Sequence, residues 1–440
     1  MGTRIKYCIA LLLAALILSG CSMRTVDEMY RLPKRSENYN DLQSAIEGAM
    51  QGLEYCAPLT GENQQTVQLA DLDGDGLDEY LLFAKGGQEK PLRILVFRNE
   101  KDGFVNIAST ECNGSAFDQV EYIDMDGDGG LEIVVGRQLS DQVIRSVSVY
   151  AMSDEELTQL VTVNYTKFLT ADLDGDNLHE LFLLRPGETE TDRGVAELYS
   201  MKNGVIDRYN EVGMSQPVDK LKRIIFGNLS GGKPAVYTAC SVSDTALVTD
   251  IFTLTDGKLG NLTLSSETDT NIRTMRNFYV YADDIDNDGV VELPSLITMY
   301  PLEDAEDTDM HHLIRWYAIN PDGSEVDKMY TYHDFVSGWY LQIDSNRANR
   351  LVANIQGNQT DFYIWDEGFN SAQKLMSIYA FTGQNREEQG LSDGRFILYK
   401  TDSVVYAALL EDSAKEHNLT QDKLVYNFRL IQKDWKTGET

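Results

Sequence analysis

Four short acidic loops hold the residues of this sequence that are best suited to chemistry. Each loop has carboxylates at its first, third, fifth and ninth positions, and Gly or Asn at its fourth and sixth. Alternate side chains of a tight turn point to one side, and Gly or Asn tolerates the positive φ that such a turn needs. The carboxylates belong to Asp71, Asp73, Asp75 and Glu79; to Asp124, Asp126, Asp128 and Glu132; to Asp172, Asp174, Asp176 and Glu180; and to Asp284, Asp286, Asp288 and Glu292.

This oxygen-rich set predicts a calcium site in each loop, and therefore about four structural Ca²⁺ ions. Ca²⁺ accepts many protein oxygens, whereas Mg²⁺ keeps more of its water. Without a cation the crowded carboxylates would repel one another, and some would stay protonated above their usual pKa. We expect the backbone carbonyl at position 7 to complete each set of ligands, which adds Leu77, Gly130, Leu178 and Val290.

Two other interpretations of the loops fit the sequence less well. The EF-hand closes with Glu at its twelfth position and lies between helices, whereas these loops close at the ninth and lie between strand-like segments. Asp, Gly and Asn are also ordinary turn residues, but four copies in register favour metal binding. A degraded copy from Asn228 to Gly232 lacks two carboxylates, and we expect it to be empty.

The loops belong to a repeat. Successive copies start at Asp71, Asp124, Asp172, Asn228 and Asp284, which are 53, 48, 56 and 56 residues apart. A β-like stretch precedes each copy and an apolar run follows it. Four short strands in every fifty or so residues are typical of a propeller blade. Residues 60–440 would give about seven such blades, of which five are recognisable, in a mainly β chain.

The loops and their flanking strands resemble the FG-GAP repeats, also called VCBS-type repeats, of integrin α-chain propellers and bacterial surface proteins. The resemblance covers about residues 66–300. It implies a β-propeller that binds Ca²⁺ in hairpin loops on one face. Ligand roles carry over to the four intact loops only. Asn177 stands where the third loop would usually have Gly, and a left-handed Asn is compatible with that site.

The N-terminus predicts export. Arg4 and Lys6 precede an apolar run, Ile9–Leu18, that is too short to span a bilayer but suits a signal peptide. The following Leu18-Ser19-Gly20-Cys21 resembles a bacterial lipobox. The resemblance implies cleavage before Cys21 and a lipid on that residue, which would hold the protein at the outer face of the cell membrane. An ordinary signal peptide with a chance cysteine is the alternative.

These observations predict four regions. Residues 1–20 are the lipoprotein signal peptide, and residues 21–60 are a tether with a short amphipathic helix. Residues 61–320 hold the blades with calcium loops. Residues 321–440 are either divergent blades or a small α+β domain, and we favour the second beyond about residue 370.

Net charge and sequence motifs exclude several functions. A net charge of -32 would repel the phosphates of nucleic acid. Pro234 stands where a nucleotide-binding loop would need Ser or Thr, so we expect no nucleotide. No motif of nucleophile, general base or catalytic metal is present, so no catalytic residue is assigned. The connectivity of Cys56, Cys112 and Cys240 cannot be read from their spacing.

We therefore expect a calcium-stabilised, lipid-anchored surface protein that binds a protein or glycan, or serves as a scaffold, without catalysis. A polysaccharide-binding or polysaccharide-processing lipoprotein is the alternative, because such repeats also accompany lyases and hydrolases. A third hypothesis is that the protein assists the assembly of another envelope complex.

Overall fold

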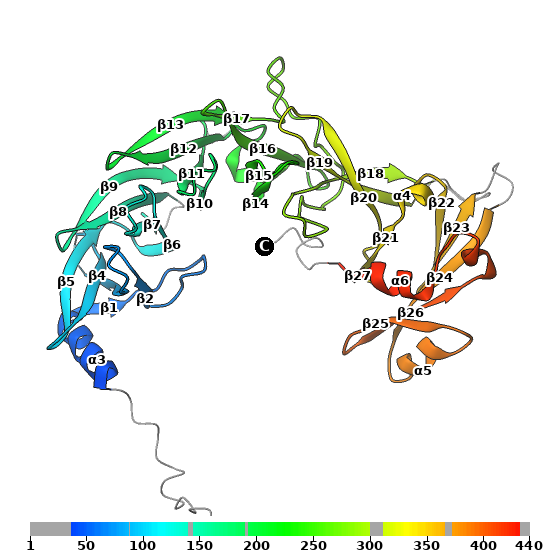
Figure 1. Cartoon of the computed structure of the whole chain (residues 1–440), viewed down its shortest axis with the longest axis horizontal. Helices are drawn as coiled ribbons and strands as arrows, with labels where there is room; N and C mark the ends of the chain where they lie inside the picture. Colours follow the sequence, from blue (N-terminus) through cyan, green and yellow to red (C-terminus); the bar gives the residue numbers. More distant parts are fainter. Residues whose placement is uncertain are drawn as a thin grey trace, which may run out of the picture.

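The computed structural model describes residues 37–87, 89–139, 144–189, 192–299, 311–365 and 372–431. The predicted signal peptide and Cys21 lie outside these residues, so their roles stay predictions. The described part is mainly β and forms six antiparallel sheets. Figure 1 shows the sheets following one another along an open arc, with β5, β9, β13 and β17 on its outer side.

The first four sheets follow the chain in order. The first contains β1 (Leu53–Tyr55), β2 (Val67–Ala70), β3 (Glu79–Gly86), β4 (Leu92–Glu100) and β5 (Gly103–Cys112). The second contains β6 (Ala116–Ile123), β7 (Glu132–Gln138), β8 (Arg145–Ser153) and β9 (Glu156–Tyr165). The third contains β10 (Lys167–Ala171), β11 (Glu180–Arg185), β12 (Val195–Lys202) and β13 (Val205–Gly213). The fourth contains β14 (Leu221–Asn228), β15 (Pro234–Ser241), β16 (Leu247–Thr255) and β17 (Lys258–Asn261).

The last two sheets depart from this simple order. The fifth contains β18 (Leu293–Thr298), β19 (His312–Ile319), β20 (Glu325–Asp334), β21 (Trp339–Ile343) and, from the far end of the chain, β27 (Phe428–Leu430). The sixth contains β22 (Leu351–Gln356), β23 (Gln359–Trp365), β24 (Ala372–Thr382), β26 (Val404–Leu410) and β25 (Phe396–Lys400).

Helices are few. They are α3 (Glu37–Ala49), α4 (Ser345–Ala348), α5 (Arg386–Leu391) and α6 (Gln421–Asn427), with short 3₁₀ turns at Val218–Lys220 and Asp412–Lys415. The amphipathic helix expected before the first strand is present as α3, whose Ile46 is buried beside Leu82 and Leu95 of the first sheet. No helix among the described residues combines the length and hydrophobicity needed to cross a bilayer.

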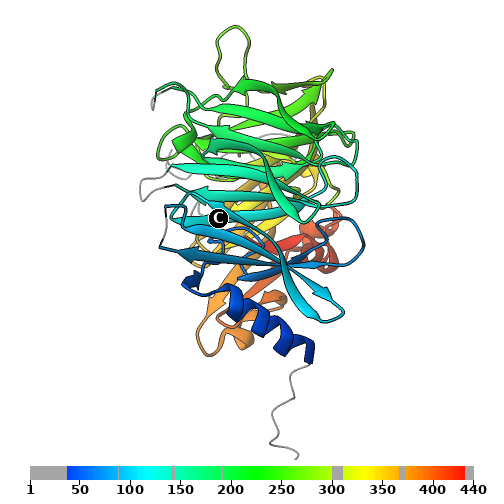
Figure 2. The same ribbon diagram turned by 90° about the vertical axis from the view of Figure 1, so that its left-hand side faces the viewer.

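Neighbouring sheets pack face to face, and this packing buries the apolar runs that follow the acidic loops. Leu81, Leu82 and Phe83 of β3 have no exposed surface. Phe83 meets Phe117 of the second sheet edge to face, with ring centroids 5.0 Å apart. In side view the strands of the first four sheets lie one layer above the next (Figure 2). Strands covered on both faces explain why these runs are continuously apolar instead of alternating.

Two expectations can be compared with the observed sheets. The described residues form six sheets, and the number of about seven blades, which the repeat length gives for residues 60–440, stays a prediction. No strand pairing among the described residues joins the first sheet to the sixth. The boundary predicted between residues 320 and 321 falls inside the fifth sheet, because β19 and β20 are hydrogen-bonded neighbours.

Candidate metal centres

Three of the acidic loops are hairpin loops, one in each of the first three sheets. They connect β2 to β3, β6 to β7 and β10 to β11, and the ninth residue of each loop is the first residue of the following strand. The fourth loop precedes β18, and there Glu292 forms an isolated bridge with Asp283. The strand pairing therefore fixes both ends of each loop and brings the ninth residue back to the first.

The expected turn geometry is present in all four loops. The fourth and sixth positions have positive φ in every copy, with values from 60° to 93°. Asn177 has φ 70° and Asn287 has φ 60°, so both adopt the left-handed conformation without Gly. A conformation that few other residues tolerate explains why only Gly and Asn stand at these two positions.

Hydrogen bonds within the loops repeat from copy to copy. The ninth-position glutamate accepts a hydrogen bond from the amide at position 2, with lengths of 3.0, 2.8, 2.8 and 3.2 Å in chain order. The carboxylate at position 1 accepts from the amide at position 6, and that at position 5 accepts from the amide at position 7. These bonds turn the acidic side chains toward the interior of the loop.

Three carboxylates converge in each loop, with one oxygen from each lying within 4.8 Å of the others. The clusters are Asp71, Asp73 and Glu79; Asp124, Asp126 and Asp128; Asp172, Asp174 and Glu180; and Asp284, Asp286 and Glu292. Asp75, Glu132, Asp176 and Asp288 lie outside these sets of three. The carbonyls of Leu77, Gly130, Leu178 and Val290 stay predicted ligands.

The donor sets fit a hard cation. Glu79, Glu132, Glu180 and Glu292 are all at most 4% exposed. One oxygen of Asp71 and one of Glu292 are buried with no hydrogen-bond partner. A buried carboxylate oxygen without a partner is costly, and a bound cation would remove that cost.

Burial and the neighbouring aspartates raise the pKa of the ninth-position glutamates. Desolvation is the larger cause, and it raises the pKa to about 7 for Glu132 and Glu180 and to about 8 for Glu292. Burial also raises the pKa of Glu79. The protein without metal thus holds protons where a cation would otherwise balance the charge.

Two basic side chains divide the loops into two kinds. Arg98 of β4 pairs with Asp73 and reaches Glu79 at 3.1 Å, while Lys328 of β20 pairs with Asp288 and lies 3.8 Å from Glu292. Among the described residues, no Lys or Arg forms an ion pair with the acidic loops that begin at Asp124 and Asp172. No sequence pattern indicates Arg98 and Lys328, because each comes from another strand of its sheet, outside the acidic loop.

Adjacent loops are bonded to one another through the backbone. The amide of Leu131 donates to the carbonyl of Asp71 over 3.0 Å, and that of His179 donates to the carbonyl of Asp124 over 3.3 Å. A Cβ on Gly130 would come within 2.8 Å of the carbonyl oxygen of Leu72. The first three loops therefore line one edge of the stacked sheets in direct contact.

The degraded copy has a structural role at this edge. The Asn228 side chain donates to the carbonyl of Gly289 over 2.8 Å, and the amide of Val291 donates to the carbonyl of Asn228 over 2.9 Å. No carboxylate cluster occurs at this copy within the described residues. It connects the fourth sheet to the last acidic loop.

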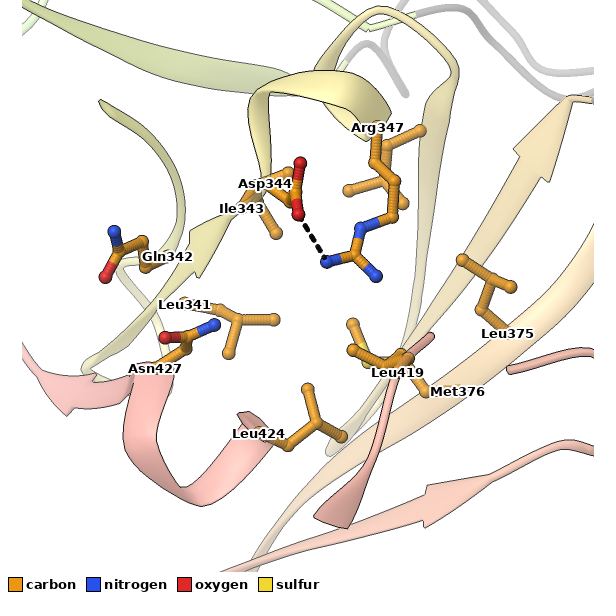
Figure 3. A pocket seen from close by; sticks show the side chains of 11 residues that line it. Leu341, Gln342, Ile343, Asp344, Arg347, Leu375, Met376, Leu419, Leu424 and Asn427 are labelled. Atoms are coloured by element: carbon orange, nitrogen blue, oxygen red, sulfur yellow. Dashed lines mark hydrogen bonds and ion pairs between the residues drawn. The ribbon is translucent and has the colours of Figure 1, made fainter. Parts of the chain in front are cut away.

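A small cavity in the last part of the described chain offers little chemistry. Figure 3 shows a cavity of about 20 Å³ between β21, β24 and α6, with mostly apolar walls and the Asp344–Arg347 ion pair at 3.4 Å. It has room for about one water molecule. Cys56, Cys112 and Cys240 are free thiols.

Comparison with known proteins supports the repeat. Residues 71–135 match the FG-GAP-like repeat family, and this stretch contains the first two acidic loops. The resemblance predicted from the loops is thereby confirmed for that part of the chain. No curated protein matches the chain significantly.

Solved structures are similar only weakly. The exotype rhamnogalacturonan lyase YesX is 13% identical, with 72% of this chain and 66% of that chain covered and a TM-score of 0.31. A rhamnogalacturonan lyase from Bacillus licheniformis is 13% identical, with 73% and 72% covered and a TM-score of 0.28. Sqt1 of Saccharomyces cerevisiae is 10% identical, with 81% and 100% covered and a TM-score of 0.31. Such likenesses carry no information about activity.

Proposed function

We propose that this chain is a calcium-stabilised scaffold that presents a binding surface for a protein or glycan outside the cell, without catalysis. The observation that carries the proposal is the repeated carboxylate cluster at one edge of successive sheets. In the exported form the chain is held at the outer face of the membrane by a lipid on Cys21.

The metal's role in this proposal is mechanical. Bound Ca²⁺ supplies positive charge to each loop. The protein's own residues do the rest. The ninth-position glutamate accepts a hydrogen bond from the second residue of its loop, and the bonds from Leu131 and His179 tie the first three loops to one another. At about 1 mM calcium and a Kd near 10⁻⁴ M, each site would add roughly 1.4 kcal/mol to the free energy of unfolding. Four sites would add on the order of 5 kcal/mol, comparable to the stability of a whole domain.

Calorimetric titration of the metal-stripped protein with Ca²⁺ tests the metal sites. We expect about four sites, a raised melting temperature, and one site fewer in Asp71→Ala. Asp219→Ala is the matched control, since this aspartate is exposed and pairs only with its neighbour Lys220. A protein that takes up no Ca²⁺, or melts at the same temperature with it, contradicts the proposal.

The binding role needs a separate experiment. Glycan and cell-wall arrays probed with the mature protein, with and without Ca²⁺, should retain it in a calcium-dependent way. If no ligand is retained, the proposed binding role is wrong, while the proposed calcium-stabilised scaffold still stands. Turnover of a polysaccharide would replace the proposal with the enzymatic alternative.

A further inference from the structure

A second candidate site lies away from the acidic loops, between the first two sheets. It is a cavity of about 330 Å³ lined by the end of β5 and by one face of β7, β8 and β9. Cavities of this size fall at the lower end of those that hold small molecules. The cavity contains none of the loop carboxylates.

Strand register gathers polar side chains on this face. Arg137 of β7 lies opposite Ser146 of β8, which lies opposite Asn164 of β9. In the next row Ser148 lies opposite Thr162, and their hydroxyls are 2.6 Å apart. The other face of the same strands carries Val134, Val147 and Val149, which are fully buried in an apolar core. Polar side chains between packed sheets need hydrogen-bond partners, which the apolar side chains of the other face do not.

Arg137 is the central group of the cavity. It is only 4% exposed, and its Nη1 donates to the carbonyl of Asn113 over 3.0 Å while Nη2 donates to Ser148. Its Nε and the hydroxyl of Ser146, which is 1% exposed, are buried without hydrogen-bond partners. Within the described part of the chain, no carboxylate lies within ion-pair distance of Arg137. A buried guanidinium with an unused donor is costly unless something accepts from it.

The surrounding charges leave the cavity positive. Lys90 and Glu111 lie at its rim, but Glu111 already pairs with Arg93. This occurs in a chain whose net charge is -32. The local sign is therefore the reverse of the overall one.

We propose that this cavity binds a small hydroxylated anion, of the size of a single sugar acid, with its carboxylate against Arg137. A guanidinium fork matches a carboxylate in geometry and charge. The Ser146 hydroxyl, with the side chains of Thr162 and Asn164, offers donors and acceptors to the ligand's hydroxyl groups. The site goes beyond the calcium scaffold and does not depend on it.

Calorimetry of the full mature protein at fixed Ca²⁺ tests the site, with sodium D-glucuronate, D-glucose and sodium sulfate as probes. We expect saturable binding of glucuronate, at least tenfold weaker binding of sulfate, and none of glucose. Arg137→Gln should weaken glucuronate binding at least tenfold. Arg145→Gln is the control: this arginine is adjacent in the chain to Ser146, points to the other face of β8 and pairs with Asp118 at 3.4 Å.

Other outcomes overturn the proposal. No saturable glucuronate binding by the unaltered protein would mean that water alone fills the cavity. If glucose binds as tightly as glucuronate, the cavity does not recognise an anion. If sulfate binds as tightly as glucuronate, the cavity does not recognise hydroxyl groups. If Arg137→Gln does not fold, Ser146→Ala decides, because its hydroxyl has no partner to lose; unchanged affinity in that variant contradicts the proposal, and a severalfold loss supports it.

Discussion

The guanidinium of Arg98 donates to the carboxylate of Glu79 over 3.1 Å, inside a loop built from acidic residues. In the last loop Lys328 of β20 pairs with Asp288 and lies 3.8 Å from Glu292. Each side chain brings positive charge to the carboxylates that a calcium ion would contact. The loops that begin at Asp124 and Asp172 receive no such charge from described residues, so the four sites should differ in affinity.

Arg98→Gln should strengthen calcium binding at the first loop, because it removes a competing positive charge at contact distance. We expect roughly a tenfold lower Kd for one of the four sites in calorimetric titration, with a smaller effect at high salt. The metal-free protein should become less stable, since buried Glu79 loses its partner. Arg93→Gln is the control on the same strand, because Arg93 pairs with Glu111 away from the loop. If the Arg98→Gln and Arg93→Gln proteins bind calcium with the same affinity, this division of the sites is wrong.

Metal-free stability should fall as pH rises. The unfolded pKa of a glutamate is near 4.5, whereas burial raises the folded pKa of Glu132 to about 7. The folded state thus holds the proton more tightly, so this stabilisation is complete below pH 4.5 and is lost as pH rises through about 7. The loss is on the order of 3 kcal/mol for Glu132. Glu180 should behave alike, and the loss at Glu292 should extend to about pH 8.

Urea unfolding of the metal-stripped protein at pH 5.5 and 8.5 measures this effect, and saturating Ca²⁺ should reverse its sign. Glu132→Gln mimics the protonated acid and should raise metal-free stability at pH 8.5 while it weakens calcium binding. Glu111→Gln, at a half-exposed position, should change neither. Metal-free protein that is equally stable at both pH values would disprove the expectation.

Close packing between loops gives a third prediction. Position 7 carries Leu77, Leu178 or Val290 in the other copies, so the backbone there accepts a side chain. Gly130 is pressed against a neighbouring loop, with the carbonyl oxygen of Leu72 at 2.8 Å from where its Cβ would be. Gly130→Ala should destabilise the protein by about 1–3 kcal/mol through overpacking and weaken calcium binding in the first two loops together.

Leu77→Ala is the matched control at the same loop position, since Leu77 is 69% exposed. Thermal melting and calcium titration of the two variants measure the difference. A Gly130→Ala protein as stable as the Leu77→Ala protein would show that the loops do not depend on their mutual contact.

The sequence predicts best what is encoded locally. The positions of Asp71, Asp124, Asp172 and Asp284, and the Gly or Asn residues after them, specify a turn that needs positive φ, and the following apolar run specifies a buried strand. The partners of those loops depend on strand pairing and sheet stacking, which leave no local pattern. Arg98 and the contact of Leu131 with Asp71 could not be predicted for that reason.

The last third of the chain was predicted least well for a related reason. The sixth sheet has no acidic loop to mark its hairpin, and its strand order inserts β26 between β24 and β25. β27 returns to pair with β21 across about ninety intervening residues, for example Tyr340 with Arg429. Such distant pairing has no periodic signal, so the repeat length alone does not specify the number of sheets.

Two buried cysteines should report how calcium stiffens different parts of the stack. Cys112 lies in the core between the first two sheets, whose loops both carry carboxylate clusters, and its Sγ is 3.1 Å from the hydroxyl of Tyr150. Cys240 lies between the third and fourth sheets, where the fourth sheet's loop is the degraded copy. Burial raises the pKa of both thiols, so both should react slowly with a thiol reagent in the folded protein.

Removal of Ca²⁺ should speed the labelling of Cys112 more than that of Cys240. If exposure of the thiol requires the sheets to separate, each calcium site lost makes opening about tenfold more frequent at roughly 1.4 kcal/mol per site. Two intact loops border Cys112 and one borders Cys240, so the ratio of the two accelerations should be about ten. Peptide mass spectrometry in a Cys56→Ser background assigns the label to each thiol. Equal acceleration would mean that calcium acts on the stack as a single unit, because opening of one interface would then require opening of the other.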